Sequence, residues 1–101
     1  MNDAVVPGTQ WYVYIIRTRC ALFYTGITTD VERRFQEHCA VFNGNVKARG
    51  AKYFRGREPA AVVYRETCCS RQAASRREYA IKQLTKQQKQ HLIATGSEQT
   101  P

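Results

Sequence analysis

Two short runs of aromatic and β-branched residues constrain the fold of this chain most. The first, WYVYII at residues 11–16, is too short for an independent helix and has the composition of a β-strand. The second, LFYTGI at residues 22–27, follows a turn at residues 18–21. This arrangement predicts an antiparallel hairpin. Gly26 is expected to end its second strand at a place where a side chain would obstruct the backbone or a ligand.

A helix is predicted directly after the hairpin, with titratable side chains at its edge. Thr29 and Glu32 have the spacing of a capping box, which places the start of the helix near Asp30. Apolar side chains at helical spacing form the expected buried stripe, namely Val31, Phe35, Cys39 and Phe42. Arg34 and His38 are four residues apart, so we expect them side by side on a flank of that stripe, near the sheet.

The segment at residues 43–59 breaks the helical pattern and is rich in cations and glycine. Its five cationic residues are Lys47, Arg49, Lys52, Arg55 and Arg57. Together with Tyr53 and Phe54 they suit phosphate contacts and base stacking. The alternative is a solvated linker whose two aromatic side chains pack into the core. The sequence leaves both interpretations open for Tyr53 and Phe54.

A third strand is predicted at residues 60–66, and Ser70 then begins a long helix without Gly or Pro until Gly96. Its apolar stripe contains Ala74, Ile81 and Leu84, and Glu78 falls on the same stripe. A carboxylate is costly to bury unpaired. Either a neighbouring cation neutralises Glu78, or Glu78 faces a cleft where a metal ion or substrate meets it.

The charge of the chain narrows the class of partner. Sixteen lysines and arginines oppose eight aspartates and glutamates, which gives a net charge of +8. So basic a chain favours a polyanionic partner, of which nucleic acid is the commonest, and an acidic lipid surface is the competitor.

Length and local composition predict a single domain, because the chain has 101 residues. We expect this domain at residues 11–92, between flexible segments at residues 1–10 and 93–101. No run of about 18 apolar residues is present, so no membrane partner is expected. Residues 1–10 lack the pattern of a signal peptide. The four cysteines form no CxxC pair, which predicts reduced thiols in a cytoplasmic protein.

These residues together resemble the GIY-YIG nuclease superfamily. The two tripeptides that give the superfamily its name correspond to residues 12–14 and 24–26, and Arg34, His38 and Glu78 follow in order. The resemblance is closest to the small stand-alone YhbQ-like subgroup, through WYVYII, YTGITTDVERR, GAKYFRGR and REYAIKQL. Both tripeptides depart from the superfamily pattern, but the substituted positions keep strand-forming residues.

The resemblance implies an α/β fold in which helices flank a three-stranded antiparallel β-sheet. It also implies a metal-dependent endonuclease that hydrolyses phosphodiester bonds in nucleic acid with one Mg²⁺ or Mn²⁺ ion. DNA is favoured over RNA as the partner, with little sequence specificity and a role in DNA repair or processing.

The implied roles follow the needs of phosphodiester hydrolysis, which are a deprotonated water, a cation for the growing negative charge and help for the leaving oxygen. By the resemblance, Glu78 holds the metal ion and Arg34 contacts the phosphate. Tyr14 or Tyr24 orients or deprotonates the attacking water, with Tyr14 favoured as the base. His38 relays that proton or donates to the phosphate.

Two other classes of function stay open at this point. A non-catalytic nucleic-acid-binding module would keep the fold and the charge. An adaptor for an acidic lipid or protein would need only the charge. The complete set of two tyrosines, Arg34, His38 and Glu78 argues against the binding module, because a binder has no reason to hold a carboxylate near a phosphate site.

Overall fold

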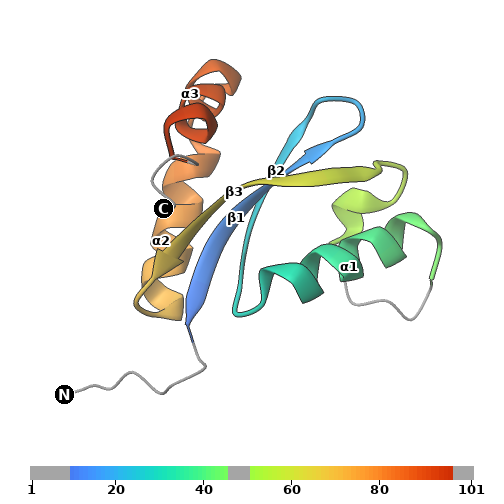
Figure 1. The fold of residues 1–101 in the computed structure, drawn as a ribbon, viewed down its shortest axis with the longest axis horizontal. Helices are drawn as coiled ribbons and strands as arrows, with labels where there is room; N and C mark the ends of the chain where they lie inside the picture. The colour runs from blue at the N-terminus through green and yellow to red at the C-terminus, as the bar shows by residue number, and fades with distance from the viewer. Residues whose placement is uncertain (1–9, 46–50, 97–101) are drawn as a thin grey trace.

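The computed structural model describes residues 10–45 and 51–96 (Figure 1). In chain order its elements are β1 (Trp11–Thr18), β2 (Phe23–Thr28), α1 (Val31–Phe42), the 3₁₀ turn η1 (Lys52–Phe54), β3 (Pro59–Cys68), α2 (Arg71–Lys82) and α3 (Lys86–Gly96). None of the helices in these two ranges is long and apolar enough to cross a membrane.

The three strands form one antiparallel sheet in the order β2-β1-β3. Strand β1 is central, and its Tyr14 lies opposite Gly26 of β2 and Arg65 of β3. The expected α/β fold, with helices flanking a three-stranded antiparallel sheet, is therefore confirmed. β1 is two residues longer than predicted and β2 is displaced by one residue. β3 is three residues longer than predicted, because it pairs with the whole of β1.

Each face of the sheet carries its own core, because successive side chains of a strand point to opposite faces. Val13 and Ile15 pack with Ala74 and Ile81 under α2 and α3. Tyr14 and Ile16 lie in the other cluster, with Val31 of α1 and Phe54 of η1. Figure 1 shows this division, with α2 and α3 on one side of the sheet and α1 on the other. The candidate site residue Tyr14 thus belongs to the α1 face.

Helix α1 begins at Val31, as predicted, but a different residue caps it. The carboxylate of Asp30 accepts a hydrogen bond from the backbone N–H of Arg33 at 3.0 Å. The Thr28 hydroxyl accepts from the N–H of Asp30 at 3.1 Å and so holds the cap in place. The predicted Thr29–Glu32 capping box was therefore wrong, because Asp30 has the extended backbone conformation and the short acceptor side chain that an N-cap requires.

The buried stripe of α1 also differs from the prediction. His38 is completely buried, whereas Phe42 is 36% exposed. Val31 is buried as expected, and Phe35 and Cys39 are half-buried. The helix is therefore rotated so that His38 faces the sheet rather than lying on the flank of the stripe. A hydrogen bond to Tyr14 compensates the imidazole for this burial.

The predicted long helix is in fact two helices, which was an error of the sequence interpretation. α2 ends at Lys82 and α3 begins at Lys86. Thr85 caps α3, because its hydroxyl accepts from the N–H of Gln88 at 3.1 Å and the Gln88 side chain accepts from the N–H of Thr85 at 2.9 Å. This capping box allows the chain to turn without Gly or Pro. α3 continues to Gly96, beyond residue 92, where the sequence placed the end of the domain.

Candidate active site

The centre of the candidate site is a buried hydrogen bond between the sheet and α1. The hydroxyl oxygen of Tyr14 lies 2.8 Å from Nε2 of His38, and the two residues are 1% and 0% exposed. Gly26 makes room for the tyrosine, since a Cβ at that position would lie 2.6 Å from the Tyr14 hydroxyl oxygen. The side-chain obstruction expected at Gly26 therefore comes from Tyr14 itself.

His38 is held neutral by its surroundings. Burial, with the positive charge of Arg34 adding to it, lowers the pKa of His38 from 6.5 to about 4, although Glu37 opposes the shift. Rings enclose it, with the centroid of Phe54 at 4.4 Å and that of Tyr24 at 5.3 Å. Nδ1 of His38 has no hydrogen-bond partner among the described residues. An unpaired buried N–H is rarer than an unpaired acceptor, so we assign the proton to Nε2, which then donates to the oxygen of Tyr14.

Both tyrosines of the site are protonated near neutral pH. Burial raises the pKa of Tyr14 far above its ordinary value, and the Tyr24 and Glu78 charges raise it further, while Arg34 lowers it. Burial also raises the pKa of Tyr24, against the lowering effects of Arg34 and Lys82. The two rings are 6.4 Å apart between centroids. Each phenol therefore needs additional positive charge near it before it can act as a base.

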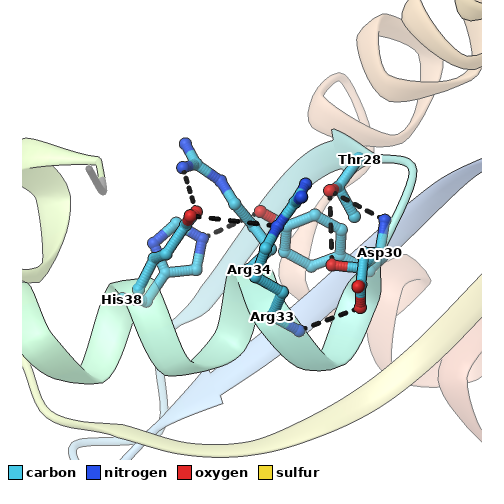
Figure 2. Close-up of polar contacts among 7 residues, drawn as sticks. Thr28, Asp30, Arg33, Arg34 and His38 are labelled. Atoms are coloured by element: carbon cyan, nitrogen blue, oxygen red, sulfur yellow. Dashed lines mark hydrogen bonds and ion pairs between the residues drawn. The ribbon is translucent and has the colours of Figure 1, made fainter. Parts of the chain in front are cut away.

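Arg34 lies on α1 beside a cleft, with Asp30 and Arg33 nearer the start of the helix and His38 one turn further along (Figure 2). Its Nη1 donates to Oε1 of Glu37 at 2.9 Å, and both side chains are about a quarter exposed. The cleft has a volume of about 340 Å³ and is lined by Trp11, Ile27, Thr28, Thr29, Arg33, Arg34 and Glu37. Two guanidinium groups on one wall make it a suitable place for an anion.

Glu78 lies on α2 and is partly exposed, at 23% of its side chain. Its Oε2 is 3.0 Å from Nζ of Lys82, one turn later on the same helix. A neighbouring cation therefore does neutralise it, as one of the two sequence hypotheses proposed. Glu78 is not among the residues that line the 340 Å³ cleft. Its negative charge nevertheless acts on both tyrosines. Burial is the main cause of the raised pKa of Tyr14 and of Tyr24, and the charge of Glu78 adds to it.

The described side chains offer a divalent ion one carboxylate ligand, Glu78, rather than a cluster of ligands. Within residues 10–45 and 51–96, no group of three or more His, Cys, Asp or Glu side chains could hold a metal ion. Mg²⁺ is commonly held by one or two carboxylates, with waters and substrate phosphates completing its shell. Glu78, as a single and partly exposed carboxylate, fits that pattern. Any such ion would be shared between Glu78 and the substrate.

The predicted basic segment is only partly described. Lys47 and Arg49 lie outside the described residues, while Lys52 and Arg55 are exposed. Arg57 is held over the ring of Tyr53, 4.5 Å from its centroid, and donates to the Tyr53 carbonyl at 3.2 Å.

The two aromatic residues of this segment differ. Phe54 is completely buried against His38 and Tyr24, so the core interpretation holds for it. Tyr53 is half-buried and contacts Tyr24, with 5.1 Å between ring centroids.

Four of the five predicted catalytic residues lie in one region of the structure, and two ion-pair partners near them were not predicted. Tyr14, Tyr24, Arg34 and His38 meet on the α1 face of the sheet. Glu37, the partner of Arg34, and Lys82, the partner of Glu78, were not predicted. Both lie three or four residues after the side chain that they neutralise, which is the spacing that could have found them.

A comparison with known protein families identifies the family of the chain. The family model described as the GIY-YIG catalytic domain matches residues 10–91. The chain therefore belongs to the GIY-YIG family, a nuclease superfamily, as the resemblance in the sequence indicated.

The similar proteins place the chain in the YhbQ-like group of this family. It is 49% identical over 96 residues to a UPF0213 protein of Desulfotalea psychrophila, covering 92% of this chain and 82% of that protein. It is 45% identical over 89 residues to the UPF0213 protein YhbQ of Escherichia coli K12, covering 88% and 82%. A UPF0213 protein of Bacillus halodurans, solved by NMR, is 33% identical over 86% of each chain, with a TM-score of 0.49.

The lowered pKa of His38 predicts a pH dependence of stability. The folded protein binds a proton at His38 less readily than the unfolded chain, so the stabilisation is complete above pH 6.5 and is lost as the pH falls toward 4. The loss should be on the order of 2–3 kcal/mol. Urea unfolding at pH 7 and pH 4.5 should show this loss of unfolding free energy in the wild-type protein. The loss should be much smaller in His38→Gln, which lacks the imidazole and keeps every other titratable group. An equal loss in both proteins would contradict the burial of a neutral imidazole.

Proposed function

We propose that this protein is a metal-dependent endonuclease that hydrolyses phosphodiester bonds in nucleic acid, with DNA favoured over RNA. The observation that carries the proposal is the buried hydrogen bond between Tyr14 and His38, with Arg34 beside it and the charge of Glu78 acting on the same tyrosine. A polar pair withdrawn from water and surrounded by rings is typical of a site built to move a proton. Its free cysteines are compatible with action in a reducing cytoplasm.

Arg34 supplies the positive charge for the transition state. Its guanidinium lines the cleft and is engaged by Glu37 in the free protein. A phosphate can replace the Glu37 carboxylate at Arg34. The carboxylate is planar and the phosphate is tetrahedral, but each is an oxyanion that can accept two parallel hydrogen bonds from a guanidinium group. Arg34 then neutralises charge on the non-bridging oxygens and at the same time lowers the pKa of Tyr14.

Tyr14, in its ionised form, is the group that takes the proton from the attacking water. It first releases its own hydroxyl proton to solvent, a loss that the positive charge of Arg34 and of a divalent ion held by Glu78 would favour. Its oxygen accepts a hydrogen bond from His38 Nε2, which stabilises the phenolate, and its position is fixed by the packing against Gly26. A divalent ion held by Glu78 would supply positive charge that lowers the pKa of a bound water and of the tyrosines. Tyr24, at the edge of the same cluster, orients the water or the substrate.

A non-catalytic nucleic-acid-binding module is the second candidate. The observation that favours it is that the charged side chains of the site already form ion pairs, Arg34 with Glu37 and Glu78 with Lys82. Nicking of supercoiled plasmid separates the two functions. The endonuclease converts it to open circles with Mg²⁺ or Mn²⁺ and not with EDTA, whereas a binder retards it in gels equally under both conditions.

Glu78→Gln should abolish nicking and change the stability little. The Glu78–Lys82 pair is partly exposed, at 23% and 51%, and exposed pairs of this kind are worth about 0.2–1 kcal/mol. Circular dichroism melts and plasmid nicking measure the two effects.

Glu66→Gln is the matched control on a neighbouring element. Its carboxylate accepts from the Tyr64 hydroxyl at 2.5 Å and from Nε of Arg77 at 3.0 Å. This variant should lose about 1–3 kcal/mol of stability and keep its activity at low temperature. If Glu78→Gln still nicked plasmid with metal, Glu78 would not be the metal ligand.

Arg34→Ala should slow cleavage by about 10²-fold or more, the usual effect of removing one charge-stabilising donor, while affinity falls far less. Arg19→Ala is the control, because Arg19 is also an arginine in an ion pair, with Glu58 at 3.4 Å, and it does not line the cleft. Single-turnover rates and equilibrium binding in EDTA separate the two quantities. Equal losses of rate and affinity in Arg34→Ala would make Arg34 a binding residue only.

A further inference from the structure

A small hollow lies next to the candidate active site, where the end of the β1–β2 turn, η1 and α3 meet. It has a volume of about 190 Å³ and is lined by Leu22, Phe23, Tyr53, Lys86 and Lys89. Tyr53 joins it to the site, because the Tyr53 ring contacts that of Tyr24 with 5.1 Å between centroids. None of its lysines was predicted to contact nucleic acid, since both lie on α3, outside the basic segment.

The hollow combines apolar walls with a cationic rim. Leu22 is 39% exposed, and the half-buried rings of Phe23 and Tyr53 form the rest of the apolar surface. Nζ of Lys86 lies 5.8 Å from the centroid of the Phe23 ring and donates to the Ala21 carbonyl at 2.8 Å.

A second cation is held in place beside the hollow. The Arg57 guanidinium lies 4.5 Å from the centroid of the Tyr53 ring and is fixed by its bond to the Tyr53 carbonyl. With Lys86, this places a cation over each of two rings, so the positive charges are positioned before any ligand arrives.

This combination suits one unpaired nucleotide. Sites for drug-sized ligands measure about 300–1,000 Å³, so the hollow is too small for them and of the right order for a single base. Aromatic walls stack on any base, and a cationic rim meets the phosphates that flank it. A base in an intact duplex is already stacked and paired and cannot enter. An acidic peptide or a lipid headgroup would use the lysines but not the rings.

We propose that this hollow is a subsite for an unpaired nucleotide of the substrate, adjacent to the phosphate that is cleaved. The inference rests on the proposed function and narrows it, because it makes the substrate a nucleic acid with a single-stranded or flipped-out nucleotide beside the cleavage position. The base packs against the Tyr53 and Phe23 rings, beside the cations that lie over them, and Lys89 contacts its phosphate.

The test is the affinity of the full chain, in EDTA, for a fluorescein-labelled single-stranded oligonucleotide and for its blunt duplex, measured by fluorescence anisotropy over a series of salt concentrations. Wild type should favour the single strand. Tyr53→Leu should weaken that binding by about fivefold or more, and Tyr53→Phe should restore it. Lys89→Gln should reduce the slope of log affinity against log salt by about 0.7, the value for one phosphate contact on a single strand.

Arg76→Gln is the matched control. It removes one exposed charge from α2, in a hollow lined by Glu66 and Cys69 on the β3 side. Its affinity and salt slope should equal those of wild type. The subsite is overturned if single strand and duplex bind equally, or if Tyr53→Leu and Lys89→Gln behave like Arg76→Gln. Lys89→Gln keeps the test valid if Tyr53→Leu folds poorly. Because no metal is present, failure of the endonuclease proposal appears only in the nicking assay.

Discussion

The hydrogen bond between Tyr14 and His38 is the contact on which the candidate site depends. It ties the central strand to α1 across a core that excludes water, since the two residues are 1% and 0% exposed. Leaving a buried polar group unpaired costs about 1–3 kcal/mol, so neither side chain can turn away freely. Gly26 leaves room for the phenol, because a Cβ there would lie 2.6 Å from its oxygen, and the Phe54 ring packs on the imidazole with 4.4 Å between centroids. Contacts from α1, β2 and η1 therefore fix the position of the Tyr14 oxygen on β1.

The charged groups around that oxygen are paired in a way that a phosphate can reverse. Glu37 holds Arg34 and Lys82 holds Glu78, and all four side chains are partly exposed. Pairs of this kind contribute little to stability, so exchanging Glu37 for a phosphate costs little free energy. The fixed phenol and the exchangeable ion pairs together form a site that is rigid at the proposed proton acceptor and adaptable at the proposed phosphate position. This division is what the proposed nuclease activity requires.

Much of the fold followed from the sequence because short periodic patterns dominate it. The aromatic and β-branched runs of β1 and β2 and the turn between them predict the hairpin, and the order of tyrosines, Arg34, His38 and Glu78 indicates the family. The complete burial of His38 was not predictable in this way. A polar residue is expected on the flank of the buried stripe of a helix unless the group that hydrogen-bonds to it is known. That partner, Tyr14, is 24 residues away and on a different element.

The break between α2 and α3 was missed for a different reason. The absence of Gly and Pro predicts a continuous helix, yet α2 ends at Lys82 and the reciprocal bonds of Thr85 and Gln88 begin a new helix. The surroundings of Glu78 could likewise be predicted only in part. Its ion pair with Lys82 follows from their spacing on one helix, but the effect of its charge on the two tyrosines depends on how α2 packs on the sheet.

The central claim is that Tyr14, held by His38, is the group that accepts the proton during cleavage. Single-turnover cleavage of a labelled oligonucleotide by Tyr14→Phe and Tyr24→Phe, with wild type beside them, tests it most directly. The loss of the Tyr14 hydroxyl should slow cleavage by about 10²-fold or more while binding in EDTA stays near wild type, the usual scale for a general base. Tyr24→Phe should lose less. A Tyr14→Phe protein that cleaves at the wild-type rate would contradict the account.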